Sequence, residues 1–247
     1  MIRMCTRLAI LLIASLPMFA SVSAARDSDL EHIKTIGIVA AMGDQLELTN
    51  VGITVFGNSR TTADIADWKL DEDIATTVGT LLNGRYQTVV ISGFDRSRFR
   101  PTGPGLFGAQ INEERETRAL AAREGAPAVD AYLLIYPLDN ENPISLSSQW
   151  LTGPGLYRHR AREAVYALGV MTLIDAKTFD AIGSKWLSLK SDDSETGSDL
   201  PYRRVEGVVP ETYEAMTPEQ KRQAETIMKD ILRESVEHSL SRLNLLP

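Results

Sequence analysis

The chain has 247 residues, of which 43% are hydrophobic and 24% are charged, and its net charge at pH 7 is −7. This acidic balance disfavours nucleic acid as a partner, because proteins that bind phosphate backbones carry a basic face. Its one cysteine, Cys5, lies near the N-terminus. We therefore exclude disulfides, cysteine-ligated metals and cysteine nucleophiles from the rest of the chain, and a packed core must stabilise the fold.

Residues 1–24 have the pattern of a secretory signal peptide. Arg3 and Arg7 form a positive n-region, Leu8–Ala20 is apolar, and Val22–Ala24 is a small-residue cleavage site. The alternative is a retained membrane anchor, but the apolar stretch has about 13 residues and a membrane-spanning helix needs about 20. We therefore expect cleavage and a periplasmic or secreted product.

The remaining chain, residues 25–247, is expected to form a single domain. It contains no apolar run long enough to cross a membrane, so we expect no membrane span in the mature chain. Cys5 precedes the apolar stretch and therefore cannot be the acylated cysteine of a lipoprotein, which would follow that stretch.

The first half of this domain is expected to alternate strands with helices. Ile33–Ala41 is β-branched and apolar, which indicates a buried strand. A second strand begins at Leu46, and its alternation slips by one residue near Asn50–Gly52, which indicates a bulge or a tight turn. The next expected elements are a helix over Asp71–Leu82, a strand over Thr88–Ile91, a helix from about Asn112 to Glu124 and a strand over Ala131–Tyr136. This order predicts helices packed on a sheet.

The second half has a different pattern. Val165–Leu189 suits a long β-hairpin with a four-residue connection at Lys177–Asp180. Ser191–Pro210 is polar and dotted with glycine and proline, which predicts an exposed loop. From Thr217, a capping box and apolar residues at helical spacing predict a closing amphipathic helix. The predicted fold class is therefore α/β (α+β), with helices packed on a mixed β-sheet.

A hexapeptide, TGPGL followed by an aromatic residue, occurs at 102–107 and again at 152–157. Two ordinary Gly-Pro turns are one interpretation. The other is a pair of loops on one rim with a shared binding role, since loops on a rigid scaffold concentrate binding residues. The candidate binding residues are Gly103, Pro104, Gly105, Phe107, Gly153, Pro154, Gly155, Tyr157, Arg158, His159 and Arg160. Their guanidinium groups suit a small anionic ligand, and their aromatic rings suit an envelope protein as partner.

Catalytic motifs are missing from the sequence. It has no G-x-S-x-G elbow, metal-ligand motif or phosphate loop, so we predict no metal and no cofactor. Gly43-Asp44-Gln45 resembles the Gly-Asp-Ser that opens one class of secreted esterases, but glutamine stands at the position of the nucleophile. A secreted hydrolase assembled from distant residues stays open as an alternative, with His159, Asp44 and Asp95 as its candidates.

The order of elements resembles a group of bacterial envelope domains. The strand IGIVAA (36–41), the hairpin VYALGVMTLIDAKTFDAIGSKWLSL (165–189) and the closing helix are similar to the small α/β domains of three kinds of protein. These are the curli-secretion lipoprotein, the penicillin-binding-protein activator lipoproteins and the N-terminal domain of the Tol translocation protein. The resemblance implies a periplasmic binding or assembly module without a catalytic centre.

Overall fold

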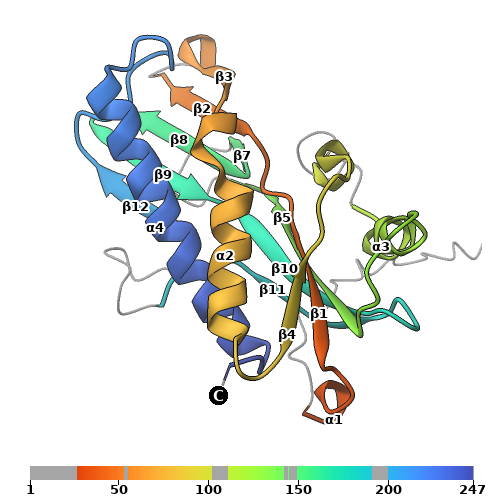
Figure 1. Ribbon diagram of the computed structural model, residues 1–247. Coiled ribbons are helices and arrows are strands. Elements are labelled where there is room, and N and C mark those ends of the chain that lie inside the picture. Colours follow the sequence, from red (N-terminus) through yellow and green to blue (C-terminus); the bar gives the residue numbers. More distant parts are fainter. Residues whose placement is uncertain are drawn as a thin grey trace, which may run out of the picture.

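Two five-stranded mixed sheets form the framework of the protein in the computed structural model (Figure 1). The structure describes residues 27–52, 55–101, 111–141, 144, 149–190 and 200–246. The predicted signal peptide and the first TGPGL copy lie outside the described residues, so the expected cleavage stays a prediction.

The first sheet has the strand order β11-β10-β5-β1-β4. Its strands are β1 (Thr35–Ala40), β4 (Gln87–Val90), β5 (Ala131–Pro137), β10 (Gly169–Asp175) and β11 (Ala181–Trp186). β1 runs parallel to both β4 and β5, whereas β10 is antiparallel to β5 and β11. Helices and loops cover both faces of this sheet, which explains why β1 and β5 are apolar along almost their whole length.

The second sheet has the order β12-β9-β8-β2-β3. Its strands are β2 (Gln45–Val51), β3 (Ser59–Asp64), β8 (Pro154–His159), β9 (Arg162–Ala167) and β12 (Tyr202–Val205). A two-stranded ladder of β6 (Asp139–Glu141) and β7 (Trp150–Thr152) accompanies it. The segment between β2 and β3 contains the short 3-10 helix η1 (Val55–Gly57).

The helices divide between the two faces of the first sheet. α2 (Leu70–Leu82) and α4 (Pro218–Arg242) lie side by side in Figure 1 and share one large core with the inner faces of both sheets. α3 (Glu113–Ala121) covers the opposite face together with the 3-10 helix η3 (Arg96–Phe99). The remaining short helices are α1 (Asp27–Leu30) and η2 (Ala66–Trp68).

The mixed α/β class predicted from the sequence is confirmed, as are most of the elements in its first half. The closing helix is also confirmed, with the predicted capping box at Thr217: its hydroxyl accepts from the Gln220 amide, and the Gln220 side chain accepts from the Thr217 amide. No helix in the described ranges combines the length and apolarity needed to cross a membrane.

Two predictions about the second half need correction. The first arm of the expected hairpin belongs to two strands, because the chain leaves β9 in the second sheet at Ala167 and enters β10 in the first sheet at Gly169. Only β10 and β11 form the hairpin. The expected loop at 191–210 includes β12, which pairs antiparallel with β9, because Tyr202 buries its ring against the second sheet while Arg204 faces solvent. Residues 191–199 lie outside the described part.

Candidate functional site

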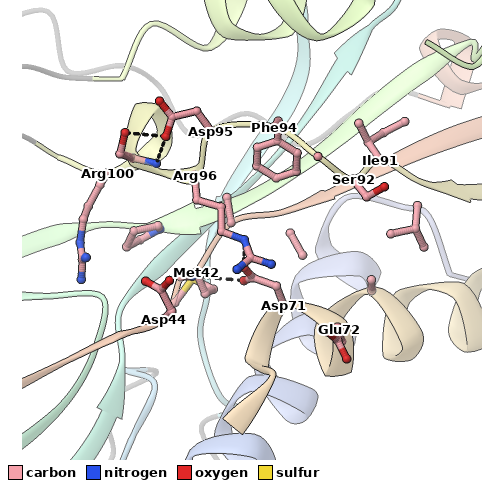
Figure 2. A pocket seen from close by; sticks show the side chains of 18 residues that line it. Met42, Asp44, Asp71, Glu72, Ile91, Ser92, Phe94, Asp95, Arg96 and Arg100 are labelled. Carbon is pink, nitrogen blue, oxygen red and sulfur yellow. Dashed lines mark hydrogen bonds and ion pairs between the residues drawn. The ribbon is translucent and has the colours of Figure 1, made fainter. Parts of the chain in front are cut away.

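A cavity of about 640 Å³ opens at the carboxyl ends of β1, β4 and β5. Its lining comes from the end of β1 and the turn after it (40–44), the first turns of α2, the segment from β4 through η3 (90–97), Arg100 and Pro137 (Figure 2). Segments that are far apart in the sequence therefore meet at one edge of the first sheet.

The topology explains why a cavity forms at this edge. β1 lies between β4 and β5, and the chain reaches β4 through α2 on one face and β5 through α3 on the other. The connections thus leave the sheet in opposite directions, which opens a crevice beyond the carboxyl ends of the parallel strands. Ligand sites of open α/β sheets lie at such switch points.

Asp71 is the buried charge of the cavity. It lies in the first turn of α2 with 7% of its surface exposed, and its Oδ1 accepts a hydrogen bond from the Gly43 amide at 3.2 Å. Its Oδ2 lies 2.9 Å from Arg96 Nε in an ion pair that lacks the geometry of a hydrogen bond. Burial raises the pKa of Asp71, although the Gly43 amide and Arg96 act to lower it.

The position of Arg96 in η3 is fixed by contacts of residues on either side of it in the sequence, Asp95 and Arg98. The Asp95 carboxylate caps η3 by accepting from the Ser97 amide at 3.0 Å and the Ser97 hydroxyl at 2.6 Å, and these bonds hold the pKa of Asp95 below its usual range. Arg98, also in η3, pairs through Nε with the buried Glu116 of α3 at 2.6 Å. The cavity wall is therefore anchored to α3.

Asp44 and Arg100 supply the remaining charges near the cavity floor. The Arg100 guanidinium donates to the carbonyl of Gln45, the residue after Asp44, at 3.3 Å. In the view of Figure 2, Asp44 lies between Arg100 and Asp71. Both Asp44 and Arg100 are half-buried, and within the described residues no ion pair joins them.

One side of the cavity is apolar. Val90, at the end of the edge strand β4, is 57% exposed and lines the cavity together with the buried Ile91. Phe94 follows, with its ring packed edge-on against Phe99 at 5.4 Å between centroids. The site therefore combines charged groups of both signs with an apolar wall, a pattern typical of small-molecule binding pockets.

The second TGPGL copy is not a loop, contrary to the expectation from the sequence. Gly153 joins β7 to β8 with a φ of +53°, and Pro154, Gly155 and Tyr157 lie buried within β8. Tyr157 is 0% exposed and packs in the core on the far face of the second sheet. A Gly-Pro pair favours a turn, but β8 is an interior strand between β2 and β9, and the local sequence pattern does not indicate this position.

Arg158, His159 and Arg160 lie outside the cavity, since Arg158 and His159 pair with the end of β2 that is distant from Asp44. Arg158 and Arg160 line a shallow hollow of about 730 Å³ with Gly52 and Gly57, next to the 96% exposed Phe56. A binding role for these basic residues and for the TGPGL copies stays a prediction.

The structure separates the three residues named for a hydrolase. Asp44 and Asp95 line the same cavity, but His159 pairs with Val51 at the far end of β2. Asp44 precedes the start of β2, so His159 lies about 20 Å away at ~3.3 Å per strand residue. The described residues contain no cluster of three or more histidine, cysteine or acidic side chains that could hold a metal ion.

Sequence reasoning did not single out Asp71, Arg96 or Arg100 as site residues. In the sequence, Asp71 marks only the start of the expected helix over 71–82, and neither arginine is among the candidate residues of the TGPGL copies. The usable signal is the position of Asp44 and Asp95 just after two expected strands, which the structure shows to be parallel, since the carboxyl ends of parallel strands meet at one edge of a sheet.

Comparisons with known proteins identify a distant structural neighbour. No protein-family model matches the chain, and a search of curated proteins finds no match. Among solved structures, the chain is similar to the crystal structure of lipoprotein GNA1162 from Neisseria meningitidis, with 13% sequence identity and a TM-score of 0.29. The comparison covers 66% of this chain and 88% of that chain.

Proposed function

We propose that the chain is an exported, non-enzymatic protein of the bacterial cell envelope that binds a small ligand in the cavity at the carboxyl ends of β1, β4 and β5. The observation that carries this proposal is the cavity itself, where a buried carboxylate, two guanidinium groups and an apolar wall converge at a switch point of the sheet. The mature product is proposed to be one domain that begins at residue 25.

Export is supported by the composition of residues 1–24. The test is N-terminal sequencing of the protein recovered from the periplasm or the medium of a Gram-negative host. We expect the sequence to begin at Ala25. Protein that keeps residues 1–24, or that stays in the cytoplasm, would contradict export while leaving the binding proposal intact.

Binding is tested by native mass spectrometry after incubation with the low-molecular-mass fraction of a bacterial envelope extract. We expect a retained small molecule with the wild-type chain. Val90→Trp should weaken retention, because the exposed Val90 side chain lines the cavity and an indole there would occupy the space beside the apolar wall. Thr62→Trp, on the exposed face of the edge strand β3, is the matched control and should retain the molecule. Equal retention by Val90→Trp, or none by the wild type, would contradict the proposal.

A second candidate function is hydrolysis by a carboxylate pair. It is favoured by the raised pKa of Asp71 beside Asp44, since general acids in clefts have such pKa values. Two observations favour binding instead: Asp71 is already held by the Gly43 amide and an ion pair with Arg96, and none of the described lining residues is a histidine. Release of nitrophenol from nitrophenyl esters or glycosides by the wild type, lost in Asp71→Asn, would support hydrolysis.

A further inference from the structure

We infer that the ligand of this cavity is a free α-amino acid with an apolar side chain, whose ammonium group binds Asp44 and whose carboxylate binds Arg100. This inference rests on the proposed function and specifies the class of ligand. It follows from the partners of each charged group in the cavity.

Four of the charged side chains of the cavity are already engaged by the protein. Asp71 and Arg96 pair with each other. Asp95 is occupied by the Ser97 amide and hydroxyl. Glu72 points away into solvent with 69% of its side chain exposed and lies 3.8 Å from Lys69. Each of these four groups therefore already has an oppositely charged or hydrogen-bonding partner within the protein.

Asp44 and Arg100 are left for the ligand. Arg100 uses one of its five N–H donors in a hydrogen bond of 3.3 Å to the Gln45 carbonyl, which leaves four donors for a ligand. The Asp44 carboxylate has no hydrogen-bond or ion-pair partner among the described residues, although its charge is close enough to help raise the pKa of Asp71. The Arg100 guanidinium contacts the backbone of Gln45, the residue after Asp44, yet no ion pair joins the Asp44 and Arg100 side chains in the described part of the chain.

A ligand that carries both charges on neighbouring atoms satisfies this arrangement. An amine alone would leave the Arg100 guanidinium unmatched, and a carboxylate alone would leave Asp44 unmatched. Asp44 and Arg100 are each half-buried, so a ligand that displaces their remaining water and leaves one charge unmatched costs free energy. The ammonium and carboxylate of an α-amino acid are joined through one carbon, so a single small molecule can contact both residues.

The apolar wall selects the side chain of that amino acid. Val90 is 57% exposed although it is a large hydrophobic residue, and Ile91 and Phe94 continue the same wall. A bound apolar side chain would cover Val90 and gain the free energy of apolar burial. The cavity volume of about 640 Å³ accommodates a residue of the size of phenylalanine.

The experiment is isothermal titration of the purified protein with phenylalanine and two single-ended analogues. Phenethylamine keeps the ring and the amine, and 3-phenylpropionate keeps the ring and the carboxylate. We expect phenylalanine to bind at least about tenfold more tightly than either analogue, since each loses one charge-assisted contact. Equal binding of phenylalanine and either analogue, or no binding of phenylalanine, would overturn the inference.

Two variants assign the contacts. Asp44→Asn should weaken phenylalanine binding by about tenfold or more and leave 3-phenylpropionate binding unchanged. Arg100→Gln should weaken phenylalanine and leave phenethylamine unchanged. Glu237→Gln and Arg204→Gln remove exposed charges outside the cavity and serve as matched controls. If the envelope extract supplies a ligand whose retention Val90→Trp weakens while phenylalanine does not bind, the inference fails and the proposed function stands.

Discussion

Gly155 of β8 lies directly across the ladder from Tyr166 of β9, and the phenol ring occupies the space that a side chain at position 155 would need. A β-carbon built on Gly155 would lie 2.2 Å from both Cζ and Oη of Tyr166 and 2.8 Å from the Glu47 carbonyl oxygen. The Tyr166 hydroxyl donates to Glu47 Oε1 at 3.1 Å, and burial raises the pKa of Tyr166. The second glycine of the 152–157 hexapeptide, Gly155, is therefore required by the close approach of the Tyr166 ring.

Gly155→Ala should destabilise the protein by at least about 2 kcal/mol, because a fully buried ring and a strand backbone must both shift. Gly79→Ala is the matched control: Gly79 lies inside α2, and a β-carbon there would meet only Thr88 Oγ1 at 3.5 Å. It should stabilise the protein by about 0.5–1 kcal/mol through helix propensity. Urea denaturation measures both. Equal stability of Gly155→Ala and the wild type would show that Tyr166 does not hold this position.

The buried position of Tyr157 also changes how the binding role of the TGPGL copies can be tested. Replacement of Tyr157 by alanine would remove a 0% exposed ring from the core, at a cost of about 3–5 kcal/mol. A loss of binding in that variant would report unfolding. Arg160→Gln is the suitable probe, because Arg160 is exposed at the turn between β8 and β9 and lines the shallow hollow.

The sequence predicted correctly those elements that are fixed by contacts between residues close together in the chain. Thr217 and Gln220 fix the start of α4 through contacts within one helical turn, so the sequence pattern alone was enough. The division of residues 165–175 between two sheets was not predictable in this way. Leu168 and Gly169 continue the apolar run, so the sequence does not show where one strand ends and the next begins. The two strands differ only in their pairing partners: β9 pairs with β8, and β10 pairs with β5.

The candidate site was predictable only in part for the same reason. Asp44 and Asp95 follow recognisable strands, but Arg96, which pairs with Asp71, comes from η3, 25 positions further along the chain. A pairing between a helix start and a distant 3-10 helix leaves no periodic signal. The order of the parallel strands, which places these segments at one edge, depends on which face each helix covers.

Thr217→Ala should lower the free energy of unfolding by about 1 kcal/mol, because the Thr217 hydroxyl accepts a hydrogen bond from the Gln220 amide in the first turn of α4. Thr226→Ala provides the control, since Thr226 is exposed in the middle of the same helix. That change should be neutral or stabilising by a few tenths of a kcal/mol. Thermal unfolding followed by circular dichroism compares the two, and equal effects would argue against a role for the cap.

Glu116→Ala should destabilise the protein by about 1–3 kcal/mol. Glu116 is 1% exposed and pairs with Arg98 Nε at 2.6 Å and with Arg115 at 2.8 Å. Both arginines are substantially exposed and can be rehydrated, so the cost should stay below that of an isolated buried charge. Because Arg98 belongs to η3, the variant should also weaken ligand retention in the cavity. Glu114→Ala, which removes an exposed pair with Arg118, should do neither.

Asp71 and Asp95 should make opposite contributions to the pH dependence of stability. Burial raises the folded-state pKa of Asp71 above its ordinary value of 3.8, so the folded protein binds this proton more tightly than the unfolded chain does. The stabilising contribution of Asp71 is therefore complete below the unfolded pKa and is lost as pH rises through the folded pKa. Hydrogen bonds from Ser97 lower the pKa of Asp95, so its contribution is present above the unfolded pKa and is lost as pH falls through the folded pKa.

Urea denaturation of the wild type, Asp71→Asn and Asp95→Asn from about pH 3 to about pH 7 tests this pair of signs. The free energy of unfolding of the wild type minus that of Asp71→Asn should fall as pH rises, because asparagine does not titrate. The same difference for Asp95→Asn should rise. Parallel curves for the two variants would show that the Asp71 carboxylate is not desolvated, and the cavity would then lack the buried charge on which the orientation of Arg96 depends.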